Sequence, residues 1–162
     1  MSSKGKLKDL IVYMLSQYPC PEDLSNSRLT KLIFLVDWKS CLVAGRRVSE
    51  IDWYFDNYGP YVEDIIELVR LDSDFEIRPV KERSGAIKSV VSLSKGFHDV
   101  VGLDEVSKVC VKFVIDLTLD KGYDEFVALI YSLYPVVTCP KYSRVDLVKK
   151  ALEYKNLILD SE

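Results

Sequence analysis

The stretch from Leu29 to Val69 constrains the fold of this chain more than any other segment. It opens with apolar residues spaced three and four positions apart, which predicts an amphipathic helix with one buried face. The residues expected on that face are Leu29, Leu32, Ile33, Val36 and Val43. A Ser-Asn-Ser run before the helix offers N-cap candidates, and Gly45 after it can adopt the left-handed conformation of a helix C-terminus. The pattern therefore predicts a central helix with both ends defined.

A short aromatic segment and a proline turn follow that helix. The run from Ile51 to Phe55 is rich in β-prone residues, which predicts a strand or extended segment. A Tyr-Gly-Pro turn comes next. We expect Pro60 at the first position of a second helix, because the N–H that proline lacks has no partner there. Glu63 and Asp64 would then lie in the first turn, where carboxylates favour the positive end of the helix dipole.

The remaining segments complete one mostly helical domain. The pattern predicts helices over Leu7–Leu15, Glu105–Leu119 capped by Asp104, Tyr123–Tyr134 stopped by Pro135, and a last one from Ser143 to about Asn156; it predicts a β-hairpin from Phe75–Val80 and Ile87–Leu93. A two-stranded hairpin is marginal alone, so it must pack on helices or gain the segment around Trp53 as a third strand. We expect an α+β fold, predominantly α-helical, with five to six helices and a small two- or three-stranded antiparallel sheet. A single domain would span residues 1–162, with frayed ends at 1–5 and 158–162.

Composition and charge argue against several kinds of function. The net charge is −3 and the pI is about 5.3, and the lysines are spread out, so this chain alone is not expected to bind nucleic acid. The N-terminus lacks a secretory signal, and no apolar run reaches the ~18 residues that span a bilayer. We therefore expect a cytoplasmic protein without membrane contact. The four cysteines form no CxxC pair, and neither a metal nor a cofactor is expected.

The sequence gives little support for catalysis. His98 is the only histidine, and a nucleophilic mechanism requires a histidine that a third group orients. Glu63 and Glu67 lie four residues apart on the exposed face of a predicted helix, which indicates solubility rather than acid–base chemistry. A hydrolase that acts through Cys41 or His98 would need that residue in a cleft beside a charged neighbour. The sequence favours a protein that is not an enzyme.

Three motifs in the first half of the chain carry a family resemblance. They are Leu29-Thr30-Lys31-Leu32-Ile33-Phe34-Leu35, Gly45-Arg46 and Tyr58-Gly59-Pro60. In this order and spacing the chain resembles the Panacea, or SocA-like, antitoxin domain, whose members carry a K-L-x-K-L-L-Y helix, a G-[KR] step and a W-x-Y-G-P turn. At the level of motifs the resemblance covers about half of the chain.

The resemblance implies a protein that binds another protein. An antitoxin of this family holds a cognate toxin inactive through direct contact, usually from a two-gene operon of a bacterium, phage or prophage. Two alternatives remain open: a non-catalytic scaffold or regulatory subunit of a phage-defence complex, and an adaptor that delivers a toxin to a protease. Panacea domains pair with unrelated toxins, so the resemblance does not identify the partner. The oligomeric state also stays open.

Five residues are candidates for binding that partner: Trp38, Arg47, Tyr54, Tyr58 and Tyr61. Aromatic residues and arginine dominate the binding energy of protein interfaces. Each also has a structural interpretation. Trp38, at the edge of the apolar stripe and expected to be half-exposed, could pack on a sheet, and the tyrosines could fill the core. Arg47 could interact with the last carbonyls of the central helix.

Overall fold

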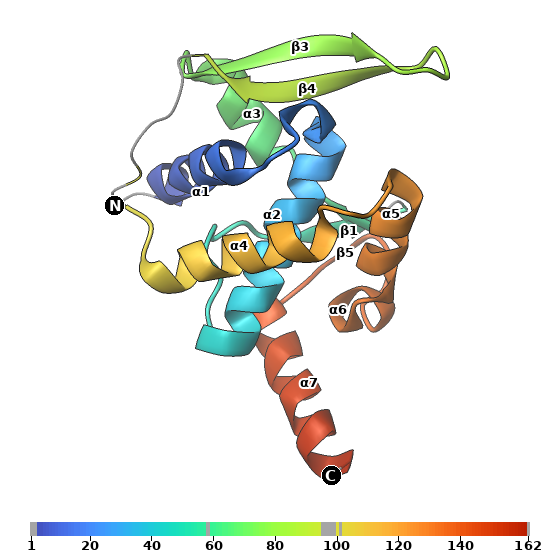
Figure 1. Ribbon diagram of the computed structural model, residues 1–162. Coiled ribbons are helices and arrows are strands. Elements are labelled where there is room, and N and C mark those ends of the chain that lie inside the picture. The colour runs from blue at the N-terminus through green and yellow to red at the C-terminus, as the bar shows by residue number, and fades with distance from the viewer. Residues whose placement is uncertain (1–2, 58, 95–99, 101, 162) are drawn as a thin grey trace.

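One long helix organises the molecule. The computed structural model describes residues 3–57, 59–94, 100 and 102–161. Helix α2 (Asn26–Ala44) runs through the middle, and the other elements gather around it (Figure 1). Helix α4 (Glu105–Thr118) crosses α2, helix α1 (Ser3–Gln17) lies beside its first half, and a β-hairpin passes over its N-terminal end.

The described residues form seven α-helices, one 3₁₀ turn and five strands. Beyond the three helices above, the elements are the 3₁₀ turn at Pro21–Asp23, β1 (Tyr54–Asp56), β2 (Gly59–Tyr61), α3 (Asp64–Leu71), β3 (Phe75–Lys81), β4 (Ile87–Leu93), α5 (Tyr123–Ser132), α6 (Tyr134–Val137), β5 (Ser143–Arg144) and α7 (Leu147–Ser161). This confirms the predicted α+β, mainly helical class.

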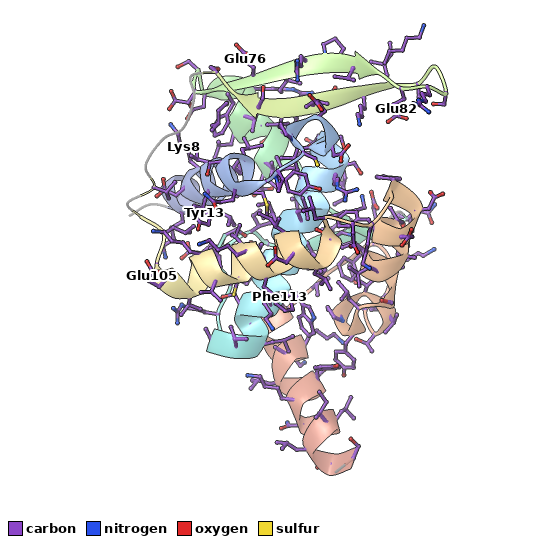
Figure 2. The ribbon with its side chains drawn as sticks, in the orientation of Figure 1. Lys8, Tyr13, Glu76, Glu82, Glu105 and Phe113 are labelled. Atoms are coloured by element: carbon purple, nitrogen blue, oxygen red, sulfur yellow. The ribbon has the colours of Figure 1, made fainter. Side chains whose placement is uncertain are left out.

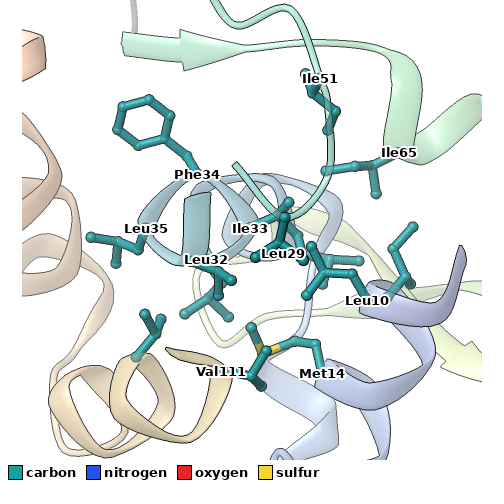
Figure 3. Packing of buried hydrophobic residues seen from close by; sticks show 14 of the residues in the cluster. Leu10, Met14, Leu29, Leu32, Ile33, Phe34, Leu35, Ile51, Ile65 and Val111 are labelled. Atoms are coloured by element: carbon teal, nitrogen blue, oxygen red, sulfur yellow. The ribbon is translucent and has the colours of Figure 1, made fainter. Parts of the chain in front are cut away.

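Helix α2 has the ends that the sequence predicts. The Ser25 side chain caps it by accepting a hydrogen bond from the Arg28 N–H at 3.2 Å, and Gly45 ends it with a φ of 73°. Its apolar side chains pack against α1 and α4; Figure 3 shows Leu10, Met14 and Val111 in this cluster. The expectation for Val43 is wrong, because its side chain is 54% exposed.

Helix α4 is apolar on two faces. Cys110, Val111, Val114 and Ile115 are buried in the core, as a thiol and three aliphatic side chains on the inner face. The outer face also carries large apolar residues, which are exposed to solvent: Val106, Val109, Phe113 and Leu117. Because apolar residues lie on both faces, the sequence pattern alone does not tell which of the two is buried.

The strands form two separate sheets. Strand β1 lies between β2 and β5 in an antiparallel three-stranded sheet, in the order β2-β1-β5. In its register Tyr54 stands opposite both Tyr61 and Arg144, so these three side chains share one face. Strands β3 and β4 form the predicted hairpin as a sheet of their own, so the segment after Trp53 does not extend it.

The hairpin is held on the helices by backbone and charged contacts. The Val91 N–H donates to the Leu24 carbonyl at 2.9 Å, just before α2 begins. At the other end, Lys8 Nζ of α1 lies 2.8 Å from an Asp72 oxygen and 2.7 Å from an Asp74 oxygen. Figure 2 shows Lys8 on the side of α1 that faces the hairpin. The hairpin therefore packs on helices, one of the two arrangements that the sequence left open.

Three predicted element boundaries are wrong. Pro60 lies in strand β2 opposite Phe55 rather than at the start of a helix, and α3 begins only at Asp64. Helix α5 ends at Ser132 rather than at Tyr134, and Pro135 lies in the first turn of the short helix α6 instead of stopping α5. Ser143 belongs to β5 and not to a helix cap. In the described residues no helix is long and apolar enough to cross a membrane.

Candidate functional site

An open cleft lined by three tyrosines lies between α2, β2 and α5. Its volume is about 460 Å³. Tyr61, Tyr123 and Tyr131 are 45%, 51% and 40% exposed. The other lining residues are Asn26, Ser27, Thr30, Lys31, Asp56, Pro60 and Val127. We call this hollow the tyrosine cleft. Large, rigid aromatic rings with one polar atom each are well suited to contact a partner, because little conformational entropy is lost on binding.

The turn before β2 lets this strand approach α5 closely, and the two elements form adjacent walls of the cleft. Gly59 has a φ of 93°, a conformation that residues with a side chain rarely adopt. A Cβ atom on Gly59 would also lie 3.0 Å from Cε1 of Tyr131. Glycine is therefore required here both for the backbone and for the close approach of β2 to α5.

A nearly buried lysine lines the cleft. Lys31, in the second turn of α2, is 9% exposed. Its Nζ donates to Ser27 Oγ at 2.9 Å, and the same Oγ lies 3.1 Å from the Tyr123 hydroxyl, so the three groups form a chain across the cleft. Among the described residues, no carboxylate forms an ion pair with Lys31.

A second hollow of about 600 Å³ adjoins the tyrosine cleft and shares Asn26, Ser27 and Tyr123 with it. Arg28 lines it, but the guanidinium is occupied by structural contacts. It donates hydrogen bonds to the Tyr18 hydroxyl, to the carbonyl of Thr118 at the end of α4 and to the carbonyl of Lys121 just after that helix. It also lies 4.5 Å from the centre of the Phe126 ring. The Arg28 side chain therefore holds neighbouring helices together, and we do not assign it to ligand binding.

A buried carboxylate anchors the loop that leads into the small sheet. Asp37 of α2 accepts hydrogen bonds from Val48 N and Ser49 N at 2.8 and 2.9 Å, from Ser49 Oγ, and from Trp53 Nε1 at 2.8 Å. Burial raises the pKa of Asp37, and the four donated hydrogen bonds act in the opposite direction by stabilising the charged form. The Trp53 and Phe34 rings also pack edge to face, with their centres 5.1 Å apart. Since β1 starts at the next residue, this cluster positions the sheet and with it Tyr61.

A comparison with protein families identifies the family of this chain. A family model described as "Antitoxin SocA-like, Panacea domain" matches residues 29–133. The chain belongs to this family. The match begins at the α2 motif and ends after α5, so it spans every wall of the tyrosine cleft except Asn26 and Ser27. No curated protein and no solved structure matches the chain.

Two of the five predicted contact residues lie on the outer face of the sheet in this Panacea domain. Tyr61 lines the tyrosine cleft, and its hydroxyl donates to Glu63 at 3.2 Å. Tyr54 stands beside it in the neighbouring strand and is half-buried. Tyr58 lies outside the described residues. The two placed tyrosines are therefore close enough to act as parts of one surface.

The other two predicted contact residues are engaged within the chain. Trp38 was expected to be half-exposed, but it is 6% exposed and packs against Tyr154 of α7, with ring centres 6.0 Å apart. Among the described residues, no hydrogen bond joins the Arg47 side chain to the last carbonyls of α2. Its guanidinium donates to the Ile51 carbonyl and lies 3.6 Å from Asp52. Both side chains stabilise the packing of neighbouring segments.

Sequence reasoning missed Lys31, Tyr123 and Tyr131 as members of the site. Lys31 had a signal, since it is the one charged residue within the apolar run of the Panacea motif. Tyr123 and Tyr131 had none, because α5 meets α2 and β2 only through the tertiary fold.

The residues considered for catalysis or metal binding in this Panacea domain differ in what the structure says of them. Burial raises the pKa of Cys41 to about 12, so its thiol is protonated and not nucleophilic near neutral pH. In the part of the chain that the structure describes, no cluster of three or more potential ligands could hold a metal ion. His98 lies outside the described residues.

Proposed function

We propose that this chain is an antitoxin that neutralises a cognate toxin by direct binding, and that the tyrosine cleft is the centre of its contact surface. Membership of the SocA-like family supports the antitoxin role. The observation that supports the location is the exposure of three tyrosines around one hollow, on a frame that Gly59 and Asp37 hold in place.

The proposed mechanism is occlusion. A stable interface covers on the order of 800 Å² on each partner, which is larger than the cleft itself. The outer face of β1 and β2, including Tyr54, adjoins the cleft and would extend the contact. A few aromatic anchors at the centre would supply most of the affinity, and the surrounding residues would exclude water.

The test is co-expression with the reading frame next to this gene. We expect the neighbouring protein alone to stop growth, this chain alone to be harmless, and the two together to restore growth and to co-purify. Tyr131→Ala combined with Tyr61→Ala should weaken rescue, while the exposed Tyr142→Ala outside the cleft should not. A neighbouring protein that is not toxic would contradict the antitoxin role. Full rescue by the double variant would contradict the location of the contact surface.

One observation favours a second candidate, a scaffold that bridges two proteins. The outer face of α4 presents Val106, Val109, Phe113 and Leu117. The Lys39 ammonium lies 3.9 Å from the centre of the Phe113 ring. The far end of α7, which leads away from the body in Figure 1, exposes Leu157, Ile158 and Leu159. Apolar surface outside the cleft would serve a second partner. Co-purification of two different neighbouring gene products with one copy of this chain would support the scaffold.

A further inference from the structure

The ammonium group of Lys31 is the least balanced charge among the described residues around the tyrosine cleft. An ammonium has three N–H donors, and Lys31 uses one of them on Ser27 Oγ. Lys31 is 9% exposed as a whole residue, and it lines the open hollow without a carboxylate as ion-pair partner among the described residues. A carboxylate that arrives with a partner would therefore meet a preformed donor and replace the water on it.

Arg28 and Lys31, two nearly buried cations on α2, differ in how many of their donors are satisfied within the chain. One turn earlier on the same helix, Arg28 is 5% exposed, and carbonyls, a hydroxyl and an aromatic ring surround its guanidinium. The fold thus satisfies one buried cation of α2 internally and leaves the other directed at an open hollow.

The charges around the cleft limit what kind of anion fits. Asp56 lines the same hollow, so a dianion such as a phosphate group would meet one positive and one negative side chain. A single carboxylate carries one charge, which one lysine can balance. The apolar walls of Tyr61, Tyr131 and Val127 also favour a ligand whose charge is embedded in apolar groups.

The size of the cleft selects a short segment rather than a folded surface. A volume of about 460 Å³ falls within the range of about 300 to 1,000 Å³ that is typical of pockets for small ligands. That space holds a few side chains of a protruding loop or chain end.

We propose that the tyrosine cleft takes a short segment of the toxin in which an aspartate or glutamate side chain, flanked by apolar residues, binds Lys31. The carboxylate accepts hydrogen bonds from Lys31 Nζ, and the flanking side chains pack on the three tyrosines. This inference rests on the proposed function, since it names the chemistry of the partner's contact.

A peptide selection tests the inference without knowledge of the toxin. The full chain is immobilised and probed with a displayed library of random twelve-residue peptides. We expect the enriched peptides to share an acidic residue between apolar ones. The best peptide is then synthesised with its acidic residue and with the matching amide, and calorimetry should show at least about tenfold weaker binding for the amide form. This comparison uses only the unaltered protein, so it does not depend on whether a variant folds.

The Lys31→Met variant assigns the effect to the proposed residue. It should bind the acid and amide peptides alike, because the group that distinguishes them is gone. Lys39→Met is the matched control on the same helix, and it should keep the full difference, since Lys39 lies over Phe113 outside the cleft. Failure to enrich any peptide, enrichment of peptides without acidic residues, equal binding of acid and amide to the unaltered protein, or retained discrimination by Lys31→Met would each overturn the inference.

The co-expression assay separates this inference from the proposed function. Loss of rescue by Lys31→Met, with rescue kept by Lys39→Met, would support both. Rescue by the unaltered chain and equally by Lys31→Met would leave the antitoxin role intact and remove the carboxylate contact. Absence of rescue by the unaltered chain would overturn the antitoxin role itself.

Discussion

At the scale of single residues, Asp37 has the largest structural task. Its carboxylate collects two backbone N–H groups, a hydroxyl and an indole N–H from one loop, so it fixes the chain between the end of α2 and the start of β1. All four partners are donors, and only an acceptor on both side-chain oxygens can satisfy them. A residue that is fully buried therefore determines where Tyr54 and Tyr61 stand.

We expect Asp37→Asn to lower the free energy of unfolding by about 2 to 4 kcal/mol, because its amide nitrogen faces donors and leaves at least one buried N–H or O–H unsatisfied. Urea denaturation followed by tryptophan fluorescence measures the loss. Asp52→Asn is the control, since that side chain is 77% exposed and forms one ion pair at 3.6 Å. Its effect should stay within about 0.5 kcal/mol. Equal stability of Asp37→Asn and the unaltered protein would contradict the assigned role.

The cysteines should differ sharply in reactivity. With the pKa of Cys41 raised to about 12, only about one molecule in ten thousand carries its thiolate at pH 8. Cys41 and Cys110 are also buried, whereas Cys20 is exposed. We expect a thiol reagent at pH 8 to label Cys20 rapidly and the two buried cysteines only in urea, as read by mass spectrometry of peptides. Rapid labelling of Cys41 in the folded protein would reopen the possibility of a reactive thiol.

At the scale of elements, local pattern predicted most helices and failed where pairing is distant. The α2 stripe, its Gly45 end, the hairpin and the Asp104 cap are all encoded within a few residues, and the structure has them. Pro60 was misplaced because proline suits both the first turn of a helix and an edge strand, and β2 is at the sheet edge. In the structure β1 pairs with β2 across the turn and with the distant β5, and the second pairing has no local signal in the sequence.

The candidate site was predicted in part for the same reason. Tyr61 belongs to the turn that the sequence singled out, and it does line the cleft. Tyr123 and Tyr131 come from α5, some sixty residues later, where nothing local distinguishes a cleft tyrosine from a core one. Trp38 was misjudged because its side chain is covered by Tyr154 of α7, a helix more than a hundred residues later in the sequence.

The approach of β2 to α5 makes Gly59 a test of element packing. We expect Gly59→Ala to destabilise the protein by about 2 to 3 kcal/mol, from the positive φ together with the 3.0 Å contact to Tyr131. Gly85→Ala at the hairpin tip is the matched control, because Gly85 has a φ of 90° but nothing within 4 Å of the added Cβ. It should cost about 1 kcal/mol.

The difference between the two glycine variants isolates the contact with Tyr131. In a Tyr131→Ala background the added methyl group has room, so the cost of Gly59→Ala should fall toward that of Gly85→Ala. Thermal and urea denaturation of five proteins supply the comparison: the unaltered chain, the three single variants and the double variant Gly59→Ala/Tyr131→Ala. An unchanged cost in that background would mean that the backbone conformation alone requires glycine.

At the scale of the whole molecule, the helices meet at the N-terminal end of α2. The Arg28 guanidinium there donates to Tyr18 after α1, to the Thr118 carbonyl of α4 and to the Lys121 carbonyl before α5. The carbonyls at the end of a helix carry partial negative charge, so they balance a buried guanidinium without a carboxylate. The opposite end of the molecule is held less firmly, because the last turns of α7 leave Leu157 and Leu159 exposed.

This arrangement predicts that Arg28 stabilises the molecule as a whole. We expect Arg28→Met to lower the free energy of unfolding by about 2 to 4 kcal/mol, because two carbonyls and a hydroxyl lose their buried donors. Arg28→Lys should recover little of this loss, since a single ammonium cannot reach all three acceptors in the fork geometry of a guanidinium. Arg46→Met is the control: its side chain is 58% exposed and its pair with Asp104 is at the surface, so the change should stay within about 0.5 kcal/mol. If Arg28→Met and Arg46→Met had the same midpoint in urea, α1, α4 and α5 would have to be held on α2 by apolar packing alone, and the tyrosine cleft beside Arg28 would keep its shape without this residue.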